Sequence, residues 1–220
     1  MPKEGNGIEI GRLKELIRAR AKAGEGMSLE DRRKQMDGNA NQFPVPEGVE
    51  IARADLEGLG GEWNIPAGAE TAPVLLYFHG GGYVQGSSVS HRHLTSRLAL
   101  AAKARVLSVD YALAPEAPFP AAVRDGVKAY RWLLDNGVEP KAIALGGDSA
   151  GGGLTVATLL AAREEGLPMP AAAIAISPWT DLTCDTGAYS SRADADPMIQ
   201  QAGIKQTAAL YLNGADARHP

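Results

Sequence analysis

Residues 142–152, Ala-Ile-Ala-Leu-Gly-Gly-Asp-Ser-Ala-Gly-Gly, join an apolar, strand-like run to the start of a small-residue helix. The segment contains a G-x-S-x-G pattern with Ser149 at its centre. Between a buried strand and a helix, this pattern is typical of a nucleophile elbow, a tight turn that holds a serine in a strained backbone conformation with its Oγ exposed. Gly147 and Gly151 leave room for the chain to double back, because a Cβ at either position would collide with it. The segment therefore predicts a nucleophilic serine at the end of a sheet strand.

A second glycine motif, His79-Gly80-Gly81-Gly82, directly follows the apolar run at residues 74–78. Acyl transfer needs hydrogen-bond donors where the negative charge of the tetrahedral intermediate develops. We predict that the backbone N–H groups of Gly81, Gly82 and Ala150 form this oxyanion hole. A lone G-x-S-x-G is often an ordinary helix start, and a lone glycine run is usually a turn. Both motifs together, each closing a predicted strand, indicate acyl transfer through Ser149.

Four histidines occur in the chain, and none is an obvious base for Ser149. His79 precedes the serine, whereas hydrolases that combine these two motifs order their triad as serine, acid, histidine. We therefore expect His79, with Gly80, to orient the glycine loop. His91 and His93 stand near a helix start, where we expect capping or solvation. Asp148 is predicted to stabilise the turn by hydrogen bonding and not to take part in catalysis.

Apolar, β-rich runs alternate with helix-length stretches along most of the chain. The predicted strands are residues 74–78, 106–109, 143–145 and 173–176, and the predicted helices are 91–103, 121–136 and 149–165. Continuous apolar runs suit strands that are buried on both faces of a parallel sheet. The alternation predicts an α/β fold, a mostly parallel doubly wound sheet with helices on both faces. His79, Asp110 and Ser149 follow strand ends, where ligands of such sheets bind.

The flanking segments have a different pattern. Before the predicted core we expect two helices, at residues 7–23 and 28–37, followed by a break in the helical pattern at residues 43–46. After this break we expect a β-hairpin, with strands at residues 49–56 and 62–65 and a turn at residues 58–61. After Trp179 the pattern becomes polar and turn-rich until a predicted helix at residues 202–212. The first helix carries basic groups around one apolar face, which we expect to dock on the protein and not on a membrane.

Composition and charge exclude several classes of protein. The 220 residues are 45% hydrophobic, which favours a globular protein with one substantial core. A net charge of -4 argues against nucleic acid as a partner. The single cysteine, Cys184, cannot form an internal disulfide, which fits a reducing compartment. No run has the length of a signal-peptide core or of a membrane span, so we expect no stable membrane insertion and a cytoplasmic location.

The chain resembles the hormone-sensitive-lipase family of microbial esterases, within the α/β-hydrolase superfamily. The resemblance rests on five motifs in order, at residues 79–83, 110–116, 147–152, 177–182 and 196–198. It implies a carboxylesterase of short and medium acyl esters that uses no metal and no cofactor. It also implies a helical cap built from residues 1–45 and 181–220 over an α/β-hydrolase core at residues 46–180. We expect five residues to line the substrate pocket: Tyr83, Asp148, Trp179, Tyr189 and Met198.

The chain departs from the family after this core. The catalytic acid and histidine of the family lie on loops after two further strands, and no segment here matches them. His219 is the only histidine after Ser149. None of the aspartates between the two follows a predicted sheet strand with a neighbouring histidine: Asp181, Asp185, Asp194, Asp196 and Asp216. We therefore expect the chain to be the amino-terminal two-thirds of an esterase. By itself it should be close to inactive and poorly stable. Its expected partners are a small ester substrate and either its own missing carboxyl-terminal segment or a second copy of the chain.

Two rivals to this interpretation stay open. One is a non-catalytic binding protein or inactive fragment that keeps the pocket but hydrolyses nothing, which the absent base favours and the intact Ser149 opposes. The other is an amidase or thioesterase that uses the same serine and oxyanion hole.

Overall fold

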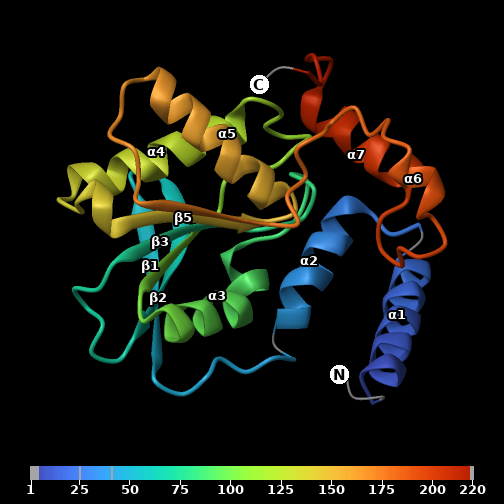
Figure 1. Ribbon diagram of the computed structural model, residues 1–220, viewed down its shortest axis with the longest axis horizontal. Coiled ribbons are helices and arrows are strands. Elements are labelled where there is room, and N and C mark those ends of the chain that lie inside the picture. The colour runs from blue at the N-terminus through green and yellow to red at the C-terminus, as the bar shows by residue number, and fades with distance from the viewer. Residues whose placement is uncertain (1–4, 25, 41, 219–220) are drawn as a thin grey trace.

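A mixed β-sheet forms the centre of the molecule in the computed structural model, which describes residues 5–24, 26–40 and 42–218 (Figure 1). The strands of this part of the chain are β1 (Val49–Leu56), β2 (Leu59–Pro66), β3 (Val74–Phe78), β4 (Arg105–Val109), β5 (Ile143–Asp148) and β6 (Ala172–Ile176). They are ordered β1-β2-β4-β3-β5-β6. Strands β4, β3, β5 and β6 run parallel, whereas β1 and β2 form an antiparallel edge. The predicted, mostly parallel α/β sheet is confirmed.

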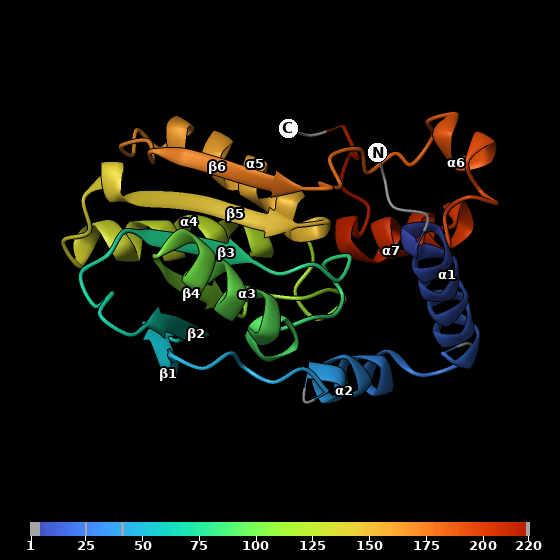
Figure 2. The same ribbon diagram turned by 60° about the horizontal axis from the view of Figure 1, so that its bottom comes forward.

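Helices cover both faces of this sheet (Figures 1 and 2). Helix α3 (Ser88–Ala102) packs on β2 and β4, while α4 (Ala121–Asp135) and α5 (Ala150–Glu164) pack together on the other face. A short 3-10 turn at Pro140–Ala142 precedes β5. The doubly wound arrangement places the carboxyl ends of the parallel strands at one side of the molecule, where ligands of such sheets bind.

Strand β3 shows why the apolar runs are strands. All five of its residues are buried. Leu76 and Phe78 pack into the core with α4 and α5, whereas Leu75 and Tyr77 pack against α3, so alternate side chains fill opposite faces.

Strand β6 is not buried on both faces, contrary to the prediction for the apolar runs. All five of its residues are exposed, and Ile174 keeps 50% of its surface accessible. The physical reason is its position: β6 pairs only with β5 and forms an edge of the sheet in the described part of the chain (Figure 2). The prediction of burial on both faces was therefore wrong for this strand.

The amino-terminal hairpin turns earlier than predicted. The turn residues are Glu57 and Gly58, with φ of 57° and 91°, the positive values that a two-residue hairpin turn needs. Asp55 Oδ1 accepts the Gly58 N–H at 2.6 Å. Gly61, expected in the turn, lies in β2 instead, where a Cβ would overlap the Ser108 carbonyl oxygen of β4. Gly61 thus serves close strand pairing and not the turn.

The remaining helices lie beyond the carboxyl ends of the parallel strands (Figure 2). They are α1 (Gly5–Ala23), α2 (Leu29–Ala40), the single turn α6 (Ala188–Ser191) and α7 (Gln201–Leu212). Ser28 caps α2, since its Oγ accepts the Asp31 N–H at 3.1 Å. Arg18 of α1 donates to the carbonyl of Asp194 at 3.0 Å, which joins the amino-terminal helices to the segment after β6.

The predicted apolar face of α1 is only partly covered. Ile17 lines a cavity against α2, but Leu13 and Leu16 keep 55% and 50% of their surface exposed. No helix in the described ranges has both the length and the apolar character that crossing a membrane requires.

Candidate active site

Ser149 occupies the sharp turn between β5 and α5. Its φ of 54° and ψ of −118° are strained for a residue with a side chain, at a cost of about 1–3 kcal/mol. Three backbone hydrogen bonds hold this geometry: the Ser149 N–H donates to Ile176 at 2.9 Å, and its carbonyl accepts from Trp179 at 2.8 Å and from Gly153 at 3.0 Å. The segment after β6 therefore helps to fix the serine.

The glycines that flank the turn are required by close backbone contacts. A Cβ at Gly151 would overlap the carbonyl oxygen of Phe78, at the end of β3, and one at Gly147 would overlap the carbonyl of Gly151. The steric prediction from the G-x-S-x-G pattern is confirmed. The same contacts bring the turn against the end of β3, where the glycine loop begins.

The glycine loop after β3 presents free N–H groups beside the serine. Gly81 and Gly82 have φ of 126° and 66°, in the region that favours glycine, and a Cβ at Gly81 would overlap the carbonyl oxygen of Gln85. Among the described residues, the N–H groups of Gly81, Gly82 and Ala150 donate to no protein acceptor. Donors left unpaired in this way are available to an oxyanion.

Asp148 connects the two motifs. Its Oδ1 accepts the Gly80 N–H at 3.0 Å and the Tyr77 hydroxyl at 2.7 Å, and His91 Nε2 lies 3.5 Å from the same oxygen. Burial raises the pKa of the Asp148 carboxyl, but the bonds from His91, Tyr77 and Gly80 outweigh burial and hold the pKa below its ordinary value. Asp148 is thus an ionised acceptor that fixes the start of the glycine loop.

His79 lies fully buried beneath the loop. Its Nδ1 is 2.8 Å from the Gly80 carbonyl oxygen, its ring stacks on Tyr111 at 4.2 Å, and Tyr111 donates to its carbonyl at 2.6 Å. Burial, and secondarily the nearby His91, lower the pKa of His79 to about 3. The ring is therefore neutral near pH 7, and its Nδ1–H is available to donate to Gly80. This is the geometry that a loop-orienting role requires.

His91 has a different position from the one expected. It is 8% exposed, its Nδ1 lies 2.9 Å from Ser90 Oγ, and its Nε2 faces Asp148. The prediction of capping or solvation was wrong for His91, because its ring is buried against Asp148 and lies 5.5 Å from the ring of His79. His93, by contrast, is partly exposed and stacks on Phe43 at 4.9 Å.

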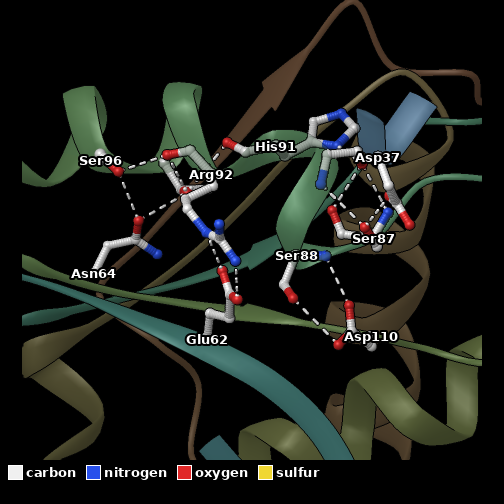
Figure 3. A network of polar contacts seen from close by, with 11 residues as sticks. Asp37, Glu62, Asn64, Ser87, Ser88, His91, Arg92, Ser96 and Asp110 are labelled. Carbon is white, nitrogen blue, oxygen red and sulfur yellow. Dashed lines mark hydrogen bonds and ion pairs between the residues drawn. The ribbon is translucent and has the colours of Figure 1, made fainter. Parts of the chain in front are cut away.

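Serines and an aspartate cap α3 in place of the histidines (Figure 3). Ser87 Oγ accepts the Ser90 N–H at 3.0 Å and donates to Asp37 of α2, while Asp110, at the end of β4, accepts the Ser88 N–H at 2.6 Å.

One turn along, Arg92 donates to Glu62 of β2 at 2.8 Å, and Ser96 donates to Asn64 of β2 at 2.9 Å (Figure 3). These bonds fix α3 on the sheet and so fix His91 beside Asp148.

A cavity of about 430 Å³ opens over Ser149. Its lining combines the two motifs with residues of α2, α3 and α7 and of the loops that follow the glycine motif and precede α7: Arg32, Met36, Gly80, Gly81, Gly82, Val84, Gln85, His91, Asp148, Ser149, Met198, Ile199, Ile204 and Thr207. Of the five residues expected in the pocket, Asp148 and Met198 lie here.

The other three lie elsewhere. Tyr83 stacks on Tyr211 at 3.9 Å, and together with Trp179 these rings line a separate cavity of about 160 Å³. Tyr189 lies on α6. His91, which the sequence did not indicate for the pocket, takes a place in its lining.

The described residues include His79, His91 and His93, and none of these forms a hydrogen bond with Ser149 Oγ. His219 lies outside the described residues. Within the described ranges no cluster of three or more His, Cys, Asp or Glu side chains could hold a metal ion.

Comparison with known proteins agrees with this site. A family described as alpha/beta hydrolase fold matches residues 75–220. An acetyl-hydrolase of Streptomyces hygroscopicus is 50% identical over 159 residues, which are 72% of this chain and 53% of that protein. An esterase of Acinetobacter venetianus is 36% identical over 180 residues, 80% of this chain and 59% of that protein. The chain thus spans little more than half the length of these curated relatives.

Solved structures match over a larger share. The structure of EstE5 soaked with p-nitrophenyl butyrate has 48% sequence identity and a TM-score of 0.90, over 96% of this chain and 71% of that one. An esterase from the bacterial hormone-sensitive lipase family has 43% identity and a TM-score of 0.92, over 100% of this chain and 73% of that one. The chain therefore belongs to the bacterial hormone-sensitive lipase family of the α/β-hydrolase superfamily.

Proposed function

We propose that the protein is a serine carboxylesterase in which Ser149 is the nucleophile. The observation that carries this proposal is the strained Ser149, which shares one cavity with the unpaired N–H donors of Gly81 and Gly82. The family to which the chain belongs and the esterases among its relatives support the same reaction.

In this reaction Ser149 Oγ attacks the ester carbonyl carbon while a histidine takes the hydroxyl proton. The carbonyl oxygen becomes an oxyanion, to which Gly81, Gly82 and Ala150 donate their backbone N–H groups. The tetrahedral intermediate collapses, the alcohol leaves with the proton from the histidine, and an acyl-serine remains. Water, activated by the same histidine, releases the acid and restores Ser149.

The base of this reaction is not one of the described histidines. His79 is neutral, fully buried and bonded to the loop, and His91 faces Asp148. We propose that a histidine outside the described residues supplies the proton transfer in the full-length protein. Tyr77, Asp148 and His91 act as positioning residues, since they fix the loop that carries the oxyanion donors.

The cavity favours a small ester as the substrate. Val84, Met198, Ile199 and Ile204 give it an apolar wall that suits a short or medium acyl chain. We propose that residues 1–45 and 181–220, the two cap segments, close this cavity over the core at residues 46–180. The single cysteine, buried and unpaired, supports a site of action in the cytoplasm.

Hydrolysis of p-nitrophenyl butyrate by the full-length protein tests the proposal. We expect turnover in the wild type and a loss on the order of 10⁴-fold or more in Ser149→Ala, because triad members act as a unit. Activity near wild type in the variant would reject Ser149 as the nucleophile.

The rival functions give different results in the same assay. A binding protein would bind the ester without turnover and would not react with a fluorophosphonate. An amidase or thioesterase would cleave amides or thioesters with a higher kcat/KM than matched esters. Either result would replace the carboxylesterase assignment.

A further inference from the structure

The space over Ser149 extends beyond the serine. Two further cavities adjoin it, and Arg32 of α2 and Met198 line all three. The larger of the two, about 530 Å³, lies between α1 and α2 and shares Met36 and Gln85 with the cavity over Ser149. A substrate longer than a simple acyl ester can therefore reach from the serine to Arg32 and past it.

Arg32 is the charged side chain of α2 without a partner among the residues that the structure describes. The other charges of this helix are paired: Glu30 with Lys34, Asp31 with Ser28, Arg33 with Glu116, and Asp37 with Ser87. An unpaired guanidinium keeps all five N–H donors available. Its exposed position at the cavity places these donors within reach of a ligand.

No ion pair joins Arg32 to a carboxylate in the described part of the chain. Asp148 is the acid that lines them in the described part of the chain, and its Oδ1 already accepts from Tyr77 and Gly80. Arg20 adds a second cation to the cavity between α1 and α2, where its contact is with Gln42 at 3.5 Å. The far end of the substrate space is therefore cationic.

We propose that Arg32 binds a carboxylate carried by the substrate, so that the enzyme prefers esters ending in a carboxylate to uncharged esters of the same length. A planar guanidinium matches a carboxylate through two parallel hydrogen bonds, which a lysine cannot reproduce. The inference rests on the proposed esterase function and adds to it the chemical class of the substrate. The carboxylate can belong to the acid or to the alcohol part of the ester.

Hydrolysis rates of matched esters by the full-length protein test this inference. Acid release is followed for two pairs of esters, each with a charged and an uncharged member. Monomethyl adipate, compared with methyl hexanoate, carries its carboxylate on the acid side of the ester. Acetoxyhexanoate, compared with hexyl acetate, carries its carboxylate on the alcohol side. We expect one pair to show a preference for the charged ester, mainly through KM. Arg32→Gln should reduce this preference about tenfold, the scale of a charge-assisted hydrogen bond. Arg32→Lys should retain part of it, and added salt should weaken it.

Arg124→Gln is the matched control, since Arg124 is an exposed arginine of α4 that lines none of these cavities. It should leave the preference as it is in the wild type. Equal kcat/KM for charged and uncharged esters, or a preference that Arg32→Gln does not reduce, would overturn the inference.

A binding measurement separates failure of this inference from failure of the esterase assignment. In the Ser149→Ala background, titration calorimetry with monomethyl adipate and with acetoxyhexanoate should show a Kd about tenfold weaker when Arg32→Gln is added. This shift would support the inference even if the wild type hydrolyses no ester. An unchanged Kd for both compounds would reject it even if hydrolysis is fast.

Discussion

The carboxylate of Asp148 accepts the backbone N–H of Gly80 at 3.0 Å, and this bond ties the glycine loop to the turn that carries Ser149. Residue 80 must be glycine for the loop to lie this close to Asp148, because a Cβ at this position would overlap Asp148 Oδ2. The proposed nucleophile Ser149 follows β5 and the proposed donors Gly81 and Gly82 follow β3, and the Asp148 side chain links the two segments. Catalysis should therefore depend on the residues that hold Asp148.

Tyr77→Phe tests this dependence. The substitution removes the 2.7 Å hydrogen bond to Asp148 while it keeps the buried ring. We expect kcat to fall by about tenfold with little change in KM, since one charge-assisted hydrogen bond is lost and the loop loses its fixed position. Steady-state kinetics with p-nitrophenyl butyrate give both constants. A change confined to KM would mean that Tyr77 shapes substrate binding and not the loop.

Gly81→Val should disrupt the oxyanion hole itself. A side chain at φ of 126° is strained, and its Cβ would overlap the Gln85 carbonyl oxygen. We expect kcat to fall by about 10² to 10³, the cost of one lost oxyanion donor. Gly38→Ala, in an α2 site with nothing within 4 Å of the added Cβ, is the control that should retain activity. If Gly81→Val raised KM and left kcat intact, the loop would be a substrate-binding element instead.

The buried His79 predicts a pH dependence of stability. Its pKa is about 3 in the folded protein and near 6.5 in the unfolded chain, so the unfolded state binds more protons between these values. The free energy of unfolding should therefore decrease as the pH falls from about 6.5 toward 3, because His79 takes up a proton when the protein unfolds. His79→Asn, whose amide can still donate to Gly80, should lose stability less steeply in this range. Urea unfolding at a series of pH values measures both slopes, and equal slopes would contradict the assignment.

The exposed strand β6 predicts self-association of residues 1–220. Ile174 and Ile176 are 50% and 39% exposed on an edge strand, a template for pairing with another chain. We expect sedimentation velocity to show oligomers that Ile174→Lys reduces. Leu100→Lys, at an exposed site of α3, is the control that should leave the oligomers in place. A monomer at all concentrations would show that the edge is protected in solution.

The parts of the fold and site that could be predicted are those fixed by local chemistry. The G-x-S-x-G turn needs glycine at fixed positions around Ser149, so its geometry is readable from the sequence alone. The apolar run of β3 likewise determines a strand that is buried on both faces.

The errors have one physical source, which is contact between segments distant in sequence. His91 looks like a helix-start residue until the glycine loop and Asp148 close over it. Gly61 looks like a turn residue until β4 approaches its Cα. The run that forms β6 is apolar enough for a buried strand, and only the order of the strands places it at an edge. Arg32 carries no signal in the sequence at all, because its significance depends on which neighbours find partners.

Trapping of the acyl-enzyme tests the central claim most directly. The full-length protein is mixed with p-nitrophenyl butyrate, quenched in acid within the first turnover and digested for mass spectrometry. We predict a butyryl group on the peptide that contains Ser149, localised to that residue, and no adduct in Ser149→Ala. A butyryl group on another residue, or steady hydrolysis by the Ser149→Ala variant, would contradict the account.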